Sequence, residues 1–527
     1  MATTNRGLFD TKRIDFLKAH PQLIALLICT IYLIVILIVS SYHKIGTYGT
    51  ETDFYGQHTH FMKSLFEKPE GPTQHGPGYP FVLWLITFVD KDVFHAGKML
   101  SIVSSVLLAF FAFKFLRNIF DSRLALLALL IMLLNPTFVE YSIAATTDMF
   151  FMFLFILMLY LLLCEPTTYV TILLSGIVGG VAFMTRTAAI YFPIAVGVCL
   201  LAINYTQKSL KERTALLLVF LSVFLVTASP WLISNYRHFG NPLANSGYNI
   251  TASTYFGEGP SAEGWGAAAQ RFNSIFDVVA YNPSQFVKLY LINIAVDFVK
   301  SIIYLFPIGI APFLTFGGLV LLLNFRRHFT RTKLSVLIFV AFLFLFQALL
   351  QWDNRFFLIL VPLYSLVISY GIVFLQAKLE KSRGILISSL GSLAIIIVVL
   401  LIFLVNTVRA TKDFIAAEPR ALIAAAKFLE SIGKPSDILM ARKPHLGFIS
   451  NLQNSFFPDA KNLDELFEIV KANHITYVLY SEMEEYYRPQ FEALSDPKNA
   501  PVWLMPIYLD KNTHLVIYKV VHNPLRE

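Results

Sequence analysis

Acidic side chains follow the first long apolar run of a chain that otherwise contains few charges. The stretch GTETDFYGQHTH holds Glu51 and Asp53 at this point. Asp53, Gln57 and His60 would share one face of a helix, because they are spaced i, i+4 and i+7. A carboxylate held in this way can take a proton from an acceptor group. The alternative is that Glu51 and Asp53 only cap a short helix by accepting hydrogen bonds from its first N–H groups.

Two further charged residues stand at the ends of apolar runs. Asp148 opens the run that follows EYSIAATT, and Arg186 interrupts GGVAFMTRTAAIYFP. An arginine at a membrane helix end needs an anionic partner, which is either a carboxylate such as Asp148 or a phosphate. Asp148 is also well placed to cap a helix, so both roles stay open. Arg237 follows PWLISNY, and Arg355 follows WDN, where it either binds an anion or pairs with Asp353.

Histidines are frequent near the first acidic pair. His58, His60 and His75 together with Asp53 could hold Zn²⁺ or Mn²⁺, since imidazole and carboxylate ligands suit these ions. The alternative is a set of surface histidines that bind lipid headgroups. We expect no resident metal and no other cofactor.

The composition indicates a membrane protein. Of 527 residues, 56% are hydrophobic and only 14% are charged, whereas a soluble domain has about a quarter charged residues. The formal charge of +8 comes from Lys and Arg in short loops, with no basic tract of the kind that binds nucleic acid. The three cysteines, Cys29, Cys164 and Cys199, lie in or beside apolar runs and indicate neither disulfides nor a metal site.

About eleven apolar runs are long enough to cross a bilayer, which takes roughly 20 residues each. The first is too long for a cleavable signal and lacks a small-residue cleavage site after it. The runs are 21–41, 93–116, 123–140, 147–164, 168–185, 188–205, 214–234, 300–323, 333–351, 356–377 and 384–406.

Every second loop is rich in Lys and Arg, which are retained on the cytoplasmic side. Examples are Lys114 with Arg117, and Arg326 with Arg327. The pattern predicts a cytoplasmic N-terminus and three outer regions, which are a loop at 42–92, a loop at 235–299 and everything after residue 407.

The last outer region differs from the membrane part and predicts a small domain of helices and short strands. From Glu418 the sequence predicts a helix, the short strand DILMAR, a second helix, the strand ITYVLYS and a closing strand HLVIYKV. We therefore predict a polytopic α-helical membrane part, residues 1–406, and a small C-terminal α/β domain, residues 407–527.

Taken in order, these motifs resemble the membrane-embedded GT-C glycosyltransferases, in the branch of protein O-mannosyltransferases and lipid A aminoarabinose transferase. The motifs are the carboxylate after the first span, HGPGYPF, TTD, GxxxGxAFMTR, PWxxxNxRxFGNP and DNRF, within residues 20–380. The resemblance implies a GT-C fold over residues 1–406 and transfer of a sugar from a polyprenyl-phosphate carrier.

The resemblance also implies roles for residues. Asp53 and Asp148 match the two catalytic aspartates of the family, and Arg186 stands where a relative has a lysine that contacts phosphate. Beside them we expect substrate contacts from Glu51, His75, Tyr79, Arg237 and Arg355.

The function predicted is an inverting glycosyltransferase whose acceptor is a lipid, a glycan or a protein. We expect it in a bacterial or archaeal cytoplasmic membrane, with the active site and the C-terminal domain on the outer side. A transporter or lipid flippase is the alternative, but its charges would gather near the bilayer midplane and its halves would repeat. A receptor that binds glycan without catalysis is a third possibility.

Overall fold

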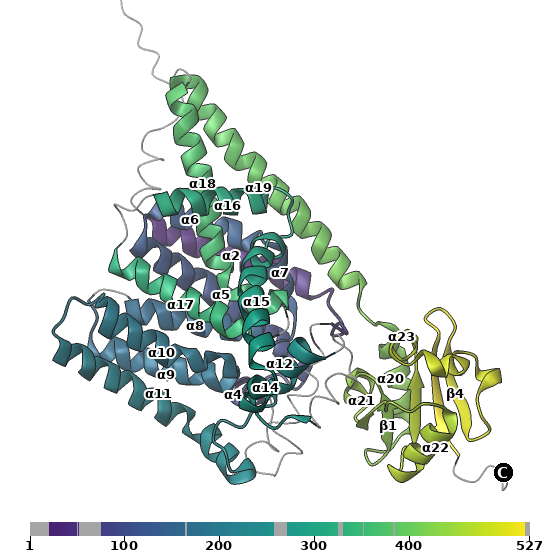
Figure 1. Ribbon diagram of the computed structural model, residues 1–527. Coiled ribbons are helices and arrows are strands. Elements are labelled where there is room, and N and C mark those ends of the chain that lie inside the picture. The colour runs from purple at the N-terminus through teal and green to yellow at the C-terminus, as the bar shows by residue number, and fades with distance from the viewer. Residues whose placement is uncertain are drawn as a thin grey trace, which may run out of the picture. The chain divides into compact units, whose positions relative to one another are not determined.

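The protein folds into two compact units, of which the first is a helical bundle (Figure 1). The structure is a computed structural model, and it describes residues 20–49, 51, 75–163, 166–257, 271–324, 330–350, 352–382 and 385–521. In unit 1 the described residues run up to Ser41 and from His75 to Asp413; in unit 2 they run from Tyr42 to Glu51 and from Phe414 onward.

Most predicted apolar runs form single helices. A helix satisfies its own backbone hydrogen bonds, which a segment in lipid requires. These helices are α2 (Pro21–Ser40), α5 (Val93–Ile119), α8 (Asp148–Leu163), α9 (Tyr169–Thr185), α11 (Leu210–Phe239), α17 (Arg331–Gln347) and α19 (Ile385–Ala416). Of these, α11 and α19 extend well beyond their predicted runs, to 30 and 32 residues.

Other runs are broken into two or three helical pieces. Run 123–140 is bent by 63° between α6 (Ser122–Leu133) and α7 (Pro136–Ile143). The bend follows from Asn135, whose side chain caps α7, and from Pro136, which cannot continue the hydrogen bonds of α6.

Three further runs are also divided. Run 188–205 comprises η1 (Thr187–Tyr191), α10 (Phe192–Gly197) and η2 (Val198–Ile203); run 356–377 comprises η4 (Asn354–Leu360) and α18 (Val361–Ser382). Run 300–323 does not form one helix, because it falls across the end of α15 (Pro283–Tyr304) and α16 (Ala311–Asn324).

Five helical stretches among the described residues are long and apolar enough to cross a membrane, or six if the bent pair is one span. They are Pro21–Ser40, Val93–Ile119, Leu210–Phe239, Asn354–Gln376, which joins η4 to α18, and Leu393–Ile432, which begins in α19 and ends in α20 (Ala421–Ile432). Shorter apolar helices, among them Asp148–Leu163 and Tyr169–Thr185, complete the bundle.

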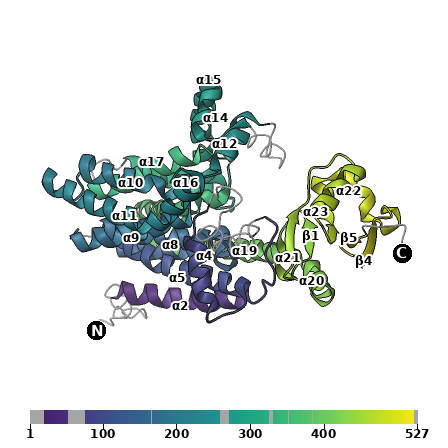
Figure 2. The same cartoon turned by 90° about the horizontal axis from the view of Figure 1, so that it is seen from below.

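Both loops predicted to lie outside contain helices. The first includes α4 (Gly78–Thr87), and the second includes α12 (Gly247–Phe256), α14 (Ile275–Tyr281) and the beginning of α15. In Figures 1 and 2, α12, α14 and α15 lie together. Buried aromatic side chains such as Tyr255 and Phe286, stacked at 4.5 Å, give this group a small core of its own.

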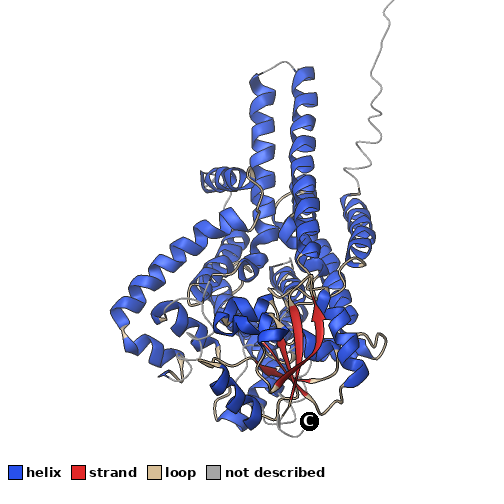
Figure 3. Ribbon diagram, turned by 90° about the vertical axis from the view of Figure 1, so that its right-hand side faces the viewer, coloured by secondary structure: helices blue, strands red, loops and turns tan. Residues whose placement is uncertain are grey.

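Unit 2 is an α/β domain around one five-stranded sheet (Figure 3). The strand order is β2-β1-β3-β5-β4, with β2, β1 and β3 parallel and with β5 antiparallel to both neighbours. The strands are β1 (Ile438–Ala441), β2 (Gln453–Phe456), β3 (Tyr477–Tyr480), β4 (Leu504–Asp510) and β5 (Leu515–Val520).

Helices cover both faces of this sheet. Side chains of α20 (Ala421–Ile432) and α21 (His445–Ile449) share one apolar core with the sheet, and those of α22 (Leu463–Ala472) share the other. The sequence predicted β1, β3 and β5 but missed β2 and β4, because QNSF is short and polar and Pro506 interrupts LMPIYLD at a β-bulge.

Candidate active site

A cavity of about 700 Å³ lies within unit 1. Aromatic side chains make up much of its wall, including Phe151, Trp231, Phe276 and Phe346. The polar residues that matter for its chemistry are His75, Asp148, Arg186, Asn235, Gln347 and Arg355. An apolar cavity with a few convergent polar groups is typical of a small-molecule site.

Asp148 and Arg186 form a buried ion pair in this cavity. Asp148 is the first residue of α8, and Arg186, which has an extended backbone, directly follows α9. Arg186 Nη1 donates to Asp148 Oδ1 over 2.5 Å, and both side chains are more than nine-tenths buried. The rings of Phe151 and Phe356 flank the guanidinium. The structure thus shows the pairing with Asp148 that the sequence offered as one of two alternatives for Arg186.

Arg355 also lines the cavity and pairs with its neighbour Asp353. Its Nε lies 3.0 Å from Asp353 Oδ2, and its backbone N–H donates to Asp353 Oδ1. Both side chains are partly exposed. Arg355 thus pairs with Asp353, as one of the two predicted alternatives stated, and it also lines the cavity.

The HGPG motif brings His75 to the same cavity. A Cβ atom on Gly76 would lie 2.3 Å from the carbonyl oxygen of Met184, and one on Gly78 would lie 2.9 Å from the backbone N of Thr185. Only glycine permits this close approach to the end of α9. His75 therefore lines the same cavity as Arg186, whereas Tyr79 of α4 is fully buried and is not a lining residue.

Arg237 does not reach the cavity. It lies on the last turn of α11 and is exposed, while Trp231 and Asn235 of the same helix line the cavity. Residues four apart share a helix face, but a residue two positions further points to the opposite side. The PWxxxNxR motif thus contributes Trp231 and Asn235 to the cavity wall. The substrate contact predicted for Arg237 stays a prediction, and the position of its side chain does not support it.

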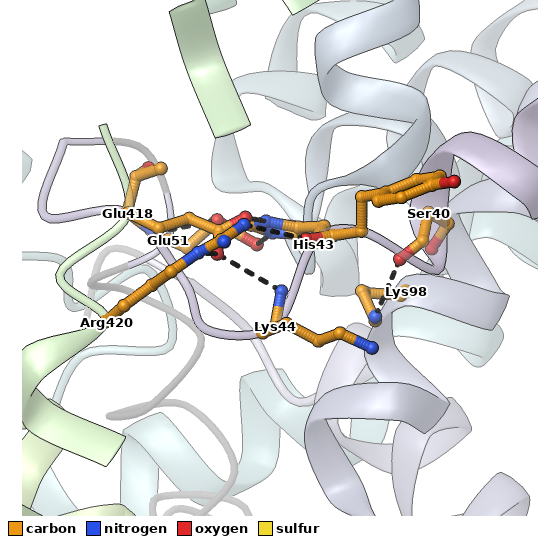
Figure 4. Close-up of polar contacts among 9 residues, drawn as sticks. Ser40, His43, Lys44, Glu51, Lys98, Glu418 and Arg420 are labelled. Carbon is orange, nitrogen blue, oxygen red and sulfur yellow. Dashed lines mark hydrogen bonds and ion pairs between the residues drawn. The ribbon is translucent and has the colours of Figure 1, made fainter. Parts of the chain in front are cut away.

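Glu51 belongs to unit 2 and is fully buried there (Figure 4). Its Oε1 lies 3.0 Å from His43 Nε2, and its Oε2 accepts from the backbone N–H of Thr47 over 2.9 Å. The other ring nitrogen of His43, Nδ1, lies 2.8 Å from Glu418 Oε1. One imidazole thus joins two carboxylates, and the described contacts of Glu51 are structural.

The electrostatics of this group favour a charged histidine. Burial by itself lowers the pKa of His43, but hydrogen bonds to Glu418 and Glu51 outweigh it, so that the pKa is raised above its ordinary value. Burial likewise raises the pKa of Glu418, but bonds from His43 and Arg420 lower it overall. The imidazolium can then donate to both carboxylates at once.

Asp53, His58 and His60 lie outside the described residues, so the predicted general base and the possible metal ligands stay predictions. Among the residues that the structure describes, His, Cys, Asp and Glu form no group of three or more suited to a metal ion.

The sequence reasoning missed several polar residues of the cavity. Asn235 Nδ2 donates to the carbonyl oxygens of Pro242 and Ala244 and so fixes the turn after α11. Asn245, at the end of that turn, donates to Thr187 Oγ1 over 2.8 Å. The signal was present in NYRHFGNPLANSG, where asparagines recur around a turn, but their partners become apparent only in three dimensions.

Comparisons with known proteins agree with this architecture. Residues 74–233, which include His75, Asp148 and Arg186, match the family described as dolichyl-phosphate-mannose-protein mannosyltransferase. No curated protein is similar enough in sequence to match the chain.

Two solved structures share the fold along almost the whole chain. ArnT from Cupriavidus metallidurans bound to undecaprenyl phosphate is 14% identical, with 94% of this chain and 98% of that chain covered and a TM-score of 0.58. The second structure is the oligosaccharyltransferase AglB from Archaeoglobus fulgidus in complex with an inhibitory peptide and a dolichol-phosphate. It is 12% identical, with 96% of this chain and 75% of that chain covered and a TM-score of 0.59. The expected GT-C fold is confirmed, and the chain is an integral membrane protein.

Proposed function

We propose that this protein is a glycosyltransferase that moves a sugar from a polyprenyl-phosphate carrier to an acceptor. The observation that carries the proposal is the Asp148–Arg186 pair at an apolar cavity of a GT-C fold. The similar ArnT structure holds undecaprenyl phosphate, and the similar AglB structure holds a dolichol-phosphate. A lipid phosphate needs both an apolar wall and a cation, and this cavity contains both.

The residues can be assigned to the steps of one displacement. The acceptor oxygen or nitrogen forms a bond to the anomeric carbon while the bond from that carbon to the phosphate oxygen breaks, so the anomeric configuration inverts. Arg186, with Arg355 beside the same cavity, stabilises the negative charge on the leaving phosphate. The acceptor proton passes to a carboxylate, for which Asp53 is the proposed base. Asp148 holds the Arg186 guanidinium in place.

The proposed location is a bacterial or archaeal cytoplasmic membrane, with the active site and the α/β domain on the outer side. The support is the alternation of basic and non-basic loops, because Lys and Arg near helix ends stay in the cytoplasm. Labelling of intact cells with an impermeant thiol reagent tests this orientation. Asn473→Cys, on the exposed surface of the α/β domain, should react, whereas His328→Cys, in a loop predicted to be cytoplasmic, should not. The reverse labelling pattern would overturn the orientation.

The activity is tested with purified protein in lipid nanodiscs, supplied with radiolabelled polyprenyl-phosphate sugars and a membrane extract as the source of acceptors. We expect label to move to an acceptor and free polyprenyl phosphate to accumulate. A protein that moves the intact lipid across a vesicle membrane without breaking the sugar–phosphate bond would instead be a flippase, and the proposal would be abandoned.

A further inference from the structure

A loop directly after α2, residues 42–51, contributes to the core of the α/β domain, although more than 350 positions separate this loop from the domain in the sequence. Ile45 in this loop is 1% exposed and belongs to the same core as Leu422 of α20, Leu439 of β1 and Ile517 of β5. The segment is thus part of the domain's interior and not a strap across its surface.

Tyr48 of the same loop lies at a special point of the sheet. Strands β1 and β3 are parallel neighbours, and the chain leaves β1 toward β2 on one side, while β3 lies on the other. In α/β sheets, ligands bind at the carboxyl ends of the two strands where the order switches in this way. In this domain Tyr48 lies at the carboxyl ends of β1 and β3.

Contacts from both strand ends define this position. The Tyr48 ring meets the His445 ring edge-on at 5.1 Å, and His445 begins α21 shortly after β1. His445 also contacts the loop backbone, since its Nε2 lies 3.3 Å from the carbonyl oxygen of Thr47. At the end of β3, the side chain of Ser481 is hydrogen-bonded to the Tyr48 hydroxyl. Burial, and then the charges of Glu484 and Glu482, raise the pKa of Tyr48.

A second group of contacts holds the two ends of the segment. The backbone N–H of Lys44 donates to Glu418 Oε2, and Arg420 Nη2 donates to the carbonyl oxygen of Tyr42. His43 joins Glu418 to Glu51, which stands only two positions before Asp53. The α/β domain therefore fixes the chain directly before the proposed base.

We propose that the α/β domain is a positioning element for residues 42–51, the described segment that follows α2, with Tyr48 as the positioning residue at the ends of β1 and β3. The inference rests on the proposed function, because the loop leads to the residue proposed as base. The ligand position of the α/β domain is thus occupied by residues 42–51 of the same chain. Sugar transfer depends on the contact of Tyr48 with the ends of β1 and β3.

Hydrogen exchange on the full-length protein tests whether Tyr48 holds the loop. Backbone amides of residues 43–48 should be protected in the wild type, and Tyr48→Ala should speed their exchange at least about tenfold, because local opening becomes easier. Tyr48→Phe keeps the ring and removes only the hydroxyl that is hydrogen-bonded to Ser481, so it should speed exchange far less than Tyr48→Ala. Tyr42→Ala is the matched control, because its side chain is 62% exposed on the same loop. Equal exchange in Tyr48→Ala and the wild type would overturn the proposal.

Transfer kinetics test whether this contact serves catalysis. Tyr48→Ala should lower kcat about tenfold or more and leave the Kd for the donor within about twofold, since a misplaced base affects the transition state and not donor binding. Tyr48→Phe should lower kcat far less than Tyr48→Ala does. Faster exchange with an unchanged kcat would overturn the positioning role. If the wild type itself transfers no sugar from any donor, the proposed function fails, whereas the exchange data still decide whether Tyr48 holds the loop.

Discussion

Arg186 and Asp148 lie 38 positions apart in sequence, and a hydrogen bond of 2.5 Å joins them at the cavity. Their helices, α8 and α9, are neighbours in the bundle (Figure 1). The carboxylate compensates a buried cation that would otherwise be costly in an apolar wall. It also fixes the direction in which the guanidinium presents its other nitrogens.

Replacing Arg186 should weaken donor binding. Arg186→Ala removes a charge-assisted contact to phosphate, and we expect a loss of about 1.5–3 kcal/mol in binding free energy. Equilibrium binding of a polyprenyl-phosphate sugar to the purified variant measures this loss. Arg409→Ala is the matched control, because Arg409 is exposed on α19 and does not line the cavity. Equal donor affinity in Arg186→Ala and the wild type would assign Arg186 to structural pairing alone.

Replacing Asp53 separates catalysis from helix capping. Asn caps a helix about as well as Asp, so Asp53→Asn should be nearly silent if capping is the only role. If Asp53 is the general base, turnover should fall roughly 10²–10⁴-fold, while donor affinity and thermal stability stay nearly constant. Single-turnover transfer assays measure the chemical step. A folded variant with wild-type turnover would end the assignment of Asp53 as base.

The His43 group should make the stability of the α/β domain depend on pH. The pKa of His43 is raised in the folded protein, so its stabilisation is complete below the ordinary value of 6.5 and is lost as the pH rises through the folded pKa. The pKa of Glu418 is lowered, so its contribution is present above the ordinary value of 4.5 and is lost as the pH falls through the folded pKa. From these two groups we expect greatest stability between pH 4.5 and 6.5.

His43→Gln tests this dependence, because glutamine does not titrate. Hydrogen exchange of the domain, measured from about pH 5 to 9, should show less loss of protection toward alkaline pH in the variant than in the wild type. His474→Asn serves as the control at an exposed position with a positive φ of 52°, which Asn tolerates. The same alkaline loss in His43→Gln as in the wild type would show that other groups cause it.

Close packing of α9 on α11 should make Gly180 sensitive to substitution. A Cβ atom there would lie 2.6 Å from Cβ of Thr227 and 3.0 Å from the carbonyl oxygen of Phe224. We expect Gly180→Ala to destabilise the protein by about 1–3 kcal/mol through overpacking. Thermal unfolding in detergent measures the effect.

Gly317 supplies the control for this prediction. It lies in α16, and a Cβ atom there would meet nothing within 4 Å. Gly317→Ala should therefore be neutral or stabilise by up to about 1 kcal/mol, because alanine favours a helix more than glycine does. If both alanine variants unfold at the same temperature, close approach is not what the GxxxG motif provides.

The sequence by itself determined the features that depend on residues close together in the chain. Long apolar runs form helical segments, whatever packs against them in space, because lipid offers the backbone no hydrogen bonds. The short runs of β-branched and aromatic residues in ITYVLYS and HLVIYKV likewise predicted β3 and β5. Asp148 and Arg186 were recognisable because a charge at the end of an apolar run needs a partner.

Only the tertiary structure decided which of these residues meet. A difference of two positions along α11 places Asn235 at the cavity and Arg237 outside it, and motif spacing did not distinguish them. Ile45 and Tyr48 look like ordinary loop residues, because their partners in the α/β domain lie more than 350 positions further along the chain. Burial and pairing between such distant segments depend on how the whole chain packs, and no local pattern encodes them.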